Sequence, residues 1–225
     1  MTTTPAVAAA RAPASDCALC PRLAGFRGTQ QAAHPEWFNA PVPSFGDDDA
    51  ELLIVGLAPG LKGANRTGRP FTGDYAGDLL YATLSKFGFA IGTYTARPDD
   101  GLALRRARIT NAVRCVPPQN KPDPAEIEAC RPFLTAELAA LPHLRVVLVL
   151  GAIAHNSVLA ALGLRRAPYP FAHGAIHHLP GGLLLVDSYH CSRLNTNTGK
   201  LTVAMFEAVF ATIAGHLGPA SAKIG

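Results

Sequence analysis

Short apolar runs alternate with helical patterns along most of this chain. The apolar runs, rich in Leu, Val and Ile, cover residues 51–56, 108–113, 145–151 and 183–187. Runs of this kind are typical of strands that are buried on both faces of a sheet. Helical patterns cover residues 75–87, 124–141, 152–162 and about 201–217. This alternation predicts an α/β fold in which helices cover both faces of a parallel sheet.

One predicted helix has an unusually clear start. Asp123 can cap it, Pro124 suits its first turn, and Glu126 completes a capping box. The helix is therefore expected to begin at Pro124.

Composition indicates a single domain. A chain of 225 residues with 48% hydrophobic content can bury one sizeable core without division into two domains. The first fifteen residues, rich in Ala, Thr and Pro, and the last residues from Gly218 are predicted to be disordered tails. The expected domain thus spans residues 16–217, with tails at residues 1–15 and 218–225.

Charge and hydropathy narrow the class of protein. The net charge of +4 permits a polyanionic partner but is well below the Lys and Arg density of a purely electrostatic DNA-coating protein. No apolar run approaches the roughly 18 residues of a membrane span, and the N-terminus lacks the apolar region of a secretory signal. We expect a cytoplasmic protein that does not contact a membrane.

Polar clusters follow each predicted strand. They begin at Gly56, Thr110, Gly151 and Ser188, so the loops that follow the four strands converge on one crevice. The first of these loops is not a phosphate-binding P-loop, because Lys62 is not preceded by Gly and followed by Ser or Thr. It is not a dinucleotide fingerprint either, because it contains a proline and does not open a helix at once.

The cysteines are a second signal. Cys17 and Cys20 form a C-x-x-C pair, and Cys115 and Cys130 follow far along the chain. Four thiolates suit either a zinc site or an iron-sulfur cluster. The long separation of Cys115 and Cys130 favours a cluster over a zinc ribbon, and the intracellular interpretation argues against disulfides.

Together these segments resemble those of a known family. The loop GLAPGLKGANRTGRPFTGD, the segment ITNAVRC, the segment YHCSRLNTNTG and the four cysteines are similar to those of family 5 (type-b) uracil-DNA glycosylases. The resemblance extends from about Cys17 to Thr202. It implies a three-layer α/β/α sandwich with a central four-stranded parallel sheet, and a 4Fe-4S cluster on the four cysteines listed above. It also implies a base excision repair activity, a hydrolase that removes uracil from DNA.

The resemblance also assigns roles around the base. Phe71 resembles the residue that stacks on uracil, and Asn111 can donate to and accept from the edge of the base. His190 resembles the histidine that donates to uracil O2 as negative charge develops there. Gly56 and Ala58 are expected to line the same pocket. A turn cap is the structural alternative for Asn111.

One position of the first loop differs from many other uracil glycosylases, namely the residue beside the water that attacks the sugar. Ala58 stands where many uracil glycosylases have a polar residue, and it can activate nothing. Asp74 is the candidate instead, either to orient water or to stabilise a cationic sugar. Its structural alternative is a helix cap, because a helical pattern follows it directly.

Other side chains are candidates for contact with the DNA outside the pocket. Arg193 or Leu194 is expected to fill the space left by the flipped base, although a plain surface loop is the alternative. Phosphate contacts are expected from Arg66, Arg69, Lys62 and Lys200. Cys191 is interpreted as a spare thiol near DNA, the pair His177–His178 as a surface feature, and His155 as a helix-start residue to which the sequence assigns no role.

Two other functions were compared with uracil excision. A non-catalytic iron-sulfur DNA-binding or redox module would keep the cysteines but would not need Phe71, Asn111 and His190 together. A relative that is trapped covalently on uracil DNA has an insertion after the second-strand asparagine, and none follows Asn111 here. The resemblance further implies a base range that extends to deaminated purines such as hypoxanthine, and we expect a monomer.

Overall fold

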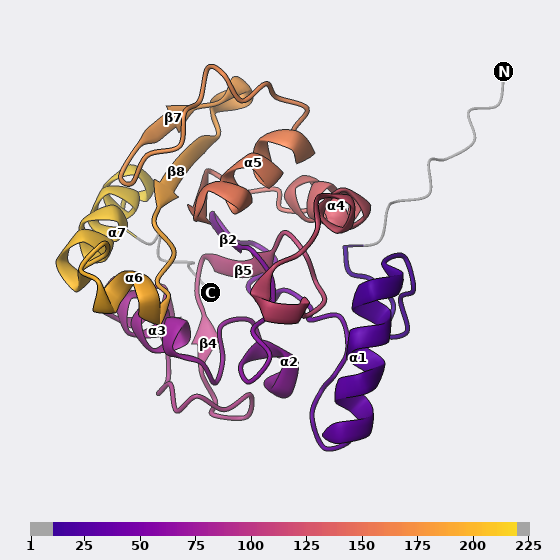
Figure 1. Ribbon diagram of the computed structural model, residues 1–225. Coiled ribbons are helices and arrows are strands. Elements are labelled where there is room, and N and C mark those ends of the chain that lie inside the picture. The colour runs from indigo at the N-terminus through magenta and orange to yellow at the C-terminus, as the bar shows by residue number, and fades with distance from the viewer. Residues whose placement is uncertain (1–10, 220–225) are drawn as a thin grey trace, which may run out of the picture.

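A mixed sheet runs through the centre of the computed structural model, which describes residues 11–219 (Figure 1). Its strand order is β1-β5-β2-β6-β8-β7. These strands are β1 (Phe45–Gly46), β2 (Leu52–Gly56), β5 (Ala107–Asn111), β6 (Val146–Leu150), β7 (Ile176–His178) and β8 (Leu184–Ser188). The four inner strands are parallel, as predicted, and the edge strands β1 and β7 are antiparallel to their neighbours. The edges were not predicted, because runs of two or three residues show no hydropathy pattern.

Helices cover both faces of the sheet, which confirms the three-layer prediction (Figure 1). One face carries α3 and α7 and the other carries α4 and α5. The helices are α1 (Pro21–Ala33), α2 (Ala64–Thr67), α3 (Tyr75–Lys86), α4 (Pro124–Ala139), α5 (Ala152–Ala161), α6 (Arg193–Asn197) and α7 (Val203–Leu217). The short strands β3 (Ala90–Ile91) and β4 (Ala103–Leu104) form a separate ribbon.

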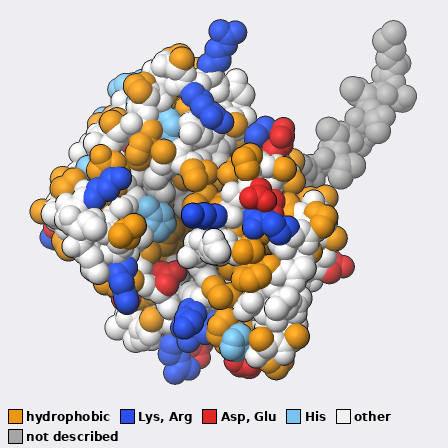
Figure 2. Space-filling view, viewed as in Figure 1, with side chains coloured by type: hydrophobic (Ala, Val, Ile, Leu, Met, Phe, Trp, Pro, Cys, Tyr) orange, Lys and Arg blue, Asp and Glu red, His pale blue; other side chains and the backbone are white. Residues whose placement is uncertain are grey.

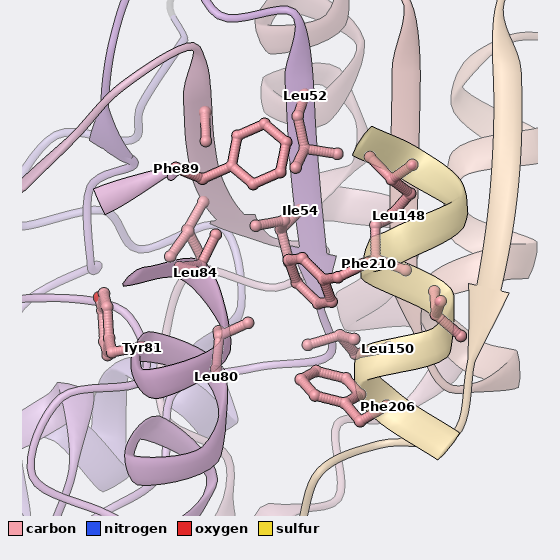
Figure 3. Packing of buried hydrophobic residues seen from close by; sticks show 14 of the residues in the cluster. Leu52, Ile54, Leu80, Tyr81, Leu84, Phe89, Leu148, Leu150, Phe206 and Phe210 are labelled. Atoms are coloured by element: carbon pink, nitrogen blue, oxygen red, sulfur yellow. The ribbon is translucent and has the colours of Figure 1, made fainter. Parts of the chain in front are cut away.

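The alternation of side chains along each strand divides the core in two. In β2, Leu52 and Ile54 belong to the cluster under α3 and α7, whereas Leu53 and Val55 belong to the cluster under α4 and α5. Figure 3 shows the first cluster, where Leu80 and Leu84 of α3 and Phe206 and Phe210 of α7 converge on the sheet. Burial on both faces holds the strand ends, and the loops that follow them, in place.

Helix α4 begins at the residue that its sequence predicts. The backbone N–H of Asp123 donates to Glu126 Oε2 at 2.7 Å, which is one half of the capping box. Cys130 lies one turn after Glu126 in the same helix.

Part of the predicted N-terminal tail, residues 11–15, is described by the structure. Residues 1–10 lie outside the described part of the chain, whereas Arg11 contacts the domain. Its guanidinium is 3.0 Å from Asp48 Oδ1 and 3.2 Å from Glu137 Oε1. The carboxylate of Glu137 is 1% exposed, and such a group requires a charged partner. At the other end, residues 220–225 of the predicted tail also lie outside the described residues.

Within residues 11–219, no helix combines the length and the apolar character needed to cross a membrane.

Candidate active site

The loops that follow the parallel strands meet in one crevice of about 400 Å³. Figure 2 shows this face hollowed near its centre, with a histidine side chain beside the hollow and Lys and Arg side chains spaced around it. The crevice contains six side chains predicted from sequence, namely those of Ala58, Phe71, Asp74, Asn111, His190 and Arg193. It also contains Tyr75, Asn120 and Ser192, which sequence reasoning missed.

Asn120 is the most informative of the missed residues. It follows a Pro-Pro-Gln turn and has a left-handed backbone with φ of 57°. Asn tolerates that conformation better than most residues do. The turn after the two prolines was therefore the available signal, but only the fold shows that it faces the crevice.

Gly56 is not among the residues that line the crevice, which corrects the prediction; it ends β2 beside Asn111 and Phe71, where no larger residue fits. A Cβ at this position would overlap Asn111 Oδ1 and would lie 2.6 Å from Cζ of the Phe71 ring. Glycine therefore allows the amide and the aromatic ring to approach the same point at the end of the strand.

Phe71 is held in a strained conformation by its neighbours. Its φ is 53°, which is unusual for a bulky residue, and its side chain is 6% exposed. The hydroxyl of Tyr81 donates to the carbonyl of Pro70 at 2.7 Å, and the hydroxyl of Tyr94 donates to the carbonyl of Phe71 at 3.3 Å. The glycine-rich loop thus folds inward and presents the ring of Phe71 5.9 Å from the ring of His190.

Asn111 carries an unsatisfied acceptor. It is the last residue of β5 and is 2% exposed. Its Oδ1 has no hydrogen-bond partner among residues 11–219. A buried acceptor without a partner costs on the order of 1–3 kcal/mol. A ligand N–H in the crevice would remove that cost.

His190 is a neutral imidazole at physiological pH. Burial lowers its pKa from 6.5 to about 4. The side-chain amide of Asn195 donates to the carbonyl of His190 at 2.8 Å and holds this part of the loop. A neutral ring has one N–H donor, so His190 can donate a hydrogen bond without bringing a full positive charge.

Asp74 caps a helix and also lines the crevice, so both interpretations from sequence apply to it. Its Oδ1 accepts from the N–H of Gly77 at 3.2 Å in the first turn of α3. Its Oδ2 lies against Gly60 and Gly63, where a Cβ would clash with it. Burial raises the pKa of Asp74, and the N–H groups of Gly77 and Ala76 partly oppose that shift.

Arg69 is not available for a phosphate contact, which corrects the prediction. It is 5% exposed and forms a bidentate pair with Asp100 at 2.7 and 2.8 Å. Its guanidinium also lies within 5.7 Å of the ring centres of Phe45, Tyr81 and Tyr94. Because the loop folds inward, the charge of Arg69 stabilises the loop.

The other five candidates for DNA contact are at the surface, namely Lys62, Arg66, Arg193, Leu194 and Lys200. Arg66 is exposed on α2, and Arg193 lies over the ring of Tyr75 at 5.3 Å. Leu194 is 72% exposed, although it is a large apolar residue. Their positions are compatible with the predicted contacts to DNA.

Cys191 is not near the surface, which corrects its interpretation as a thiol beside DNA. It is 0% exposed, and its thiol donates to the carbonyl of Ala76 at 3.4 Å. Burial raises its pKa to about 12, so the group stays a thiol.

The other four cysteines converge, although they are far apart in sequence. Cys17, Cys20, Cys115 and Cys130 line one small cavity. The guanidinium of Arg27 donates to Cys115 Sγ at 3.0 Å, and the backbone N–H of Arg114 donates to Cys130 Sγ at 3.3 Å.

The surroundings of these four thiols have an electrostatic consequence. Burial raises the pKa of Cys20 and Cys115, and it raises that of Cys130 to about 11. Several bare thiolates are therefore unfavourable in this cavity, and a cationic centre would stabilise them.

The fold and the crevice together define a class of α/β protein with a binding site for a planar polar ring. Residues 43–214 match the family model of the uracil DNA glycosylase superfamily. The chain is 49% identical to the type-5 uracil-DNA glycosylase of Thermus thermophilus, over 84% of this chain and 89% of that protein. It is 42% identical to the type-5 enzyme of Mycobacterium bovis, with coverage of 87% and 76%. It is 40% identical to that of Pyrobaculum aerophilum, with 90% coverage of both chains. This protein belongs to the type-5 uracil-DNA glycosylases, which confirms the resemblance.

Proposed function

We propose that this protein removes uracil from DNA by hydrolysing the N-glycosidic bond, which leaves an abasic site. The observation that carries the proposal is the unpartnered Oδ1 of Asn111 beside the ring of Phe71. Uracil presents an N–H between two carbonyls, so its N3–H can donate to this oxygen while a carbonyl accepts from the Asn111 amide. A base must leave the helical stack to reach such a site.

His190 stabilises the departing base. Negative charge develops on the uracil as the glycosidic bond lengthens, and a donor already in place stabilises it most strongly. The lowered pKa of His190 keeps the ring neutral, with one N–H to donate. Phe71 holds the face of the base while this charge develops.

Asp74 acts on the sugar side of the bond. Ala58 offers no polar atom, so Asp74 supplies the carboxylate in this crevice that can face a cationic sugar or orient water. The reaction does not need a strong base if the uracil anion departs before water is captured.

Side chains on the surface around the crevice hold the DNA. The exposed Leu194 fills the gap that the flipped base leaves, and Arg193 and Arg66 contact phosphates. Every group in this scheme belongs to one chain, so we propose a monomer. Since its substrate is DNA, we place the enzyme inside the cell.

A 4Fe-4S cluster is our proposal for the four-cysteine cavity. Four thiol donors and no carboxylate or histidine line it, and two of the sulfurs accept N–H hydrogen bonds. This donor set fits an iron-sulfur cluster. When bound, the cluster would cross-link the segment before α1 to the end of β5 and to α4, and it would thereby stabilise the fold. Iron and sulfide analysis tests this proposal, and stoichiometric zinc without iron would contradict it.

Release of free uracil from labelled duplex DNA, followed by alkaline cleavage of the abasic site, tests the function. The double variant Asn111→Ala, His190→Ala is the matched control. Intact DNA after incubation with the cluster-loaded protein would instead favour the non-catalytic iron-sulfur module. We see no observation in the crevice that favours that module.

The room around Ala58 supports a wider range of bases. A methyl group occupies less of the crevice than a polar side chain would, so we propose that hypoxanthine is also excised. Duplexes with hypoxanthine that stay intact while uracil duplexes are fully processed would rule this out.

A further inference from the structure

A buried cluster of ionisable side chains lies behind the crevice and takes no part in the scheme above. His155 of α5 is 1% exposed, Asp187 of β8 is 0% exposed, and the side chain of His177 of β7 is 11% exposed. His155 lies at the start of a helix, as the sequence suggested, but it is buried, and His177 is not the surface residue that the sequence suggested. The tertiary fold brings all three together from separate elements.

The hydrogen bonds of the Asp187 carboxylate are complete. Its Oδ1 is 2.7 Å from Nδ1 of His155. Its Oδ2 is 3.2 Å from Nε2 of His177 and accepts from the N–H of Ala172 at 3.1 Å. A carboxylate with this many donors is well stabilised even without water.

Both ring nitrogens of His155 have an oxygen partner. Its Nδ1 faces the carboxylate of Asp187, and its Nε2 is 2.9 Å from the backbone carbonyl of Tyr169. These contacts fix the orientation of the ring and tie it to a buried carboxylate. A buried polar pair of this kind seldom adds stability over apolar packing, which raises the question of what this pair does.

The pair is joined to the backbone that carries His190. Asp187 lies three positions before His190. Its backbone carbonyl accepts from the N–H of Gly174 at 2.8 Å, and its backbone N–H donates to the carbonyl of Ala175 at 2.9 Å. The N–H of Tyr189 donates to Nδ1 of His173 at 3.1 Å, which ties the next residue to the same segment.

His155 makes the second connection. It lies in the first turn of α5, where its N–H donates to the carbonyl of Gly151 at 3.1 Å, and the N–H of Gly151 donates to the carbonyl of Ser188 at 2.8 Å. A Cβ on Gly151 would lie 3.8 Å from Cβ of His190. The cluster therefore joins the start of α5 to the end of β8, immediately before His190.

We propose that Asp187, with His155 and His177, is a positioning group that sets the direction of the His190 donor. The inference rests on the proposed function of His190. Zinc also binds to such side chains, and the candidate ligand atoms lie within 4.8 Å of one another. A metal-free, hydrogen-bonded cluster is better supported, because the carboxylate and both nitrogens of His155 already have partners.

The test is Asp187→Asn, which keeps the shape but removes the charge. We expect the single-turnover rate of uracil release at saturating enzyme to fall about 10- to 100-fold, as for a misplaced catalytic group. The enzyme concentration that gives half the maximal rate should change less than about threefold, because base contacts remain. Leu159→Ala, a buried substitution on α5 away from the cluster, is the matched control for lost stability.

The rates are compared below the melting temperature of each variant. Parental rate in folded Asp187→Asn would overturn the proposal, and so would an equal loss in Leu159→Ala at equal stability.

A spectroscopic measurement tests the proposal without activity. In protein labelled with ¹⁵N-histidine, the ring signals of His155 should move in Asp187→Asn, because the variant changes the partner of Nδ1. The His190 ring signals should move in Asp187→Asn but not in Leu159→Ala. Unmoved His190 signals, or one zinc per chain in the purified protein, would overturn the proposal. Absence of uracil release by the parental protein would contradict the proposed function, while the His190 signals would still decide the positioning role.

Discussion

At the scale of single residues, we propose that Asn111 and His190 act on negative charge that exists only as the bond breaks. We expect Asn111→Ala and His190→Ala each to slow single-turnover excision roughly 10²- to 10³-fold, as for one lost oxyanion donor. Affinity for a non-cleavable uracil analogue should change less. Parental rates in both variants would show that this crevice is not the active site.

The variant Asp74→Asn distinguishes a chemical role of Asp74 from its structural role as a helix cap. Asn is as good a helix cap as Asp, so Asp74→Asn should leave α3 intact and keep DNA affinity nearly unchanged. The rate should fall, because the variant lacks the charge that faces the sugar. Single-turnover rates and thermal melting, measured together, distinguish the two roles. A melting temperature that falls in step with the rate would favour the cap alone.

The pKa of His190 has a consequence for stability. It is about 4 in the folded protein and about 6.5 in the unfolded chain. Between these values the unfolded state binds more protons, so the contribution of His190 is complete above pH 6.5 and is lost as pH falls toward 4. In urea unfolding, the free energy of unfolding should therefore decrease less from pH 7 to pH 5 in His190→Gln than in the parental protein. An equal loss in both proteins would contradict the lowered pKa, and His178→Gln, at an exposed position, is the control.

At the scale of elements, α6 presents Leu194 to the solvent. Ser192 caps this helix, accepting from the N–H of Asn195 at 3.4 Å, so the leucine has a defined direction. Leu194→Ala should slow excision from duplex DNA more than from single-stranded DNA, because a single strand leaves no gap to fill. The ratio of the two rates is the measurement, and Val203→Ala, another exposed apolar position, is the control. An unchanged ratio would exclude Leu194 as the wedge.

At the scale of the whole molecule, the four-cysteine cavity joins the N-terminal segment to the sheet and to α4. We expect Cys17→Ser, Cys20→Ser, Cys115→Ser and Cys130→Ser each to lose iron, brown colour and solubility. Cys191→Ser should keep all three, since Cys191 lies in a different part of the core. Iron analysis of the purified variants checks this, and full iron content in Cys130→Ser would remove that residue from the ligand set.

The charge of the whole surface also affects the affinity for DNA. With a net charge of +4 and arginines around the crevice, binding to undamaged DNA should be weak and should fall with salt.

The sequence by itself determined the parallel strands, the helices between them and the start of α4. These depend on hydropathy period and on capping residues that are close in the chain. The sequence also determined most of the residues in the crevice, because the carboxyl ends of parallel strands lie at the same edge of the sheet.

Only the tertiary structure decided which charges are buried. Arg69 meets Asp100, and His155 meets Asp187, across 31 and 32 positions of sequence. Cys191 lies in the core, although the residue before it in the chain, His190, lines the crevice. No local pattern distinguishes a buried ionic group from a solvated one, because the partner that stabilises it is supplied by a different element of the fold.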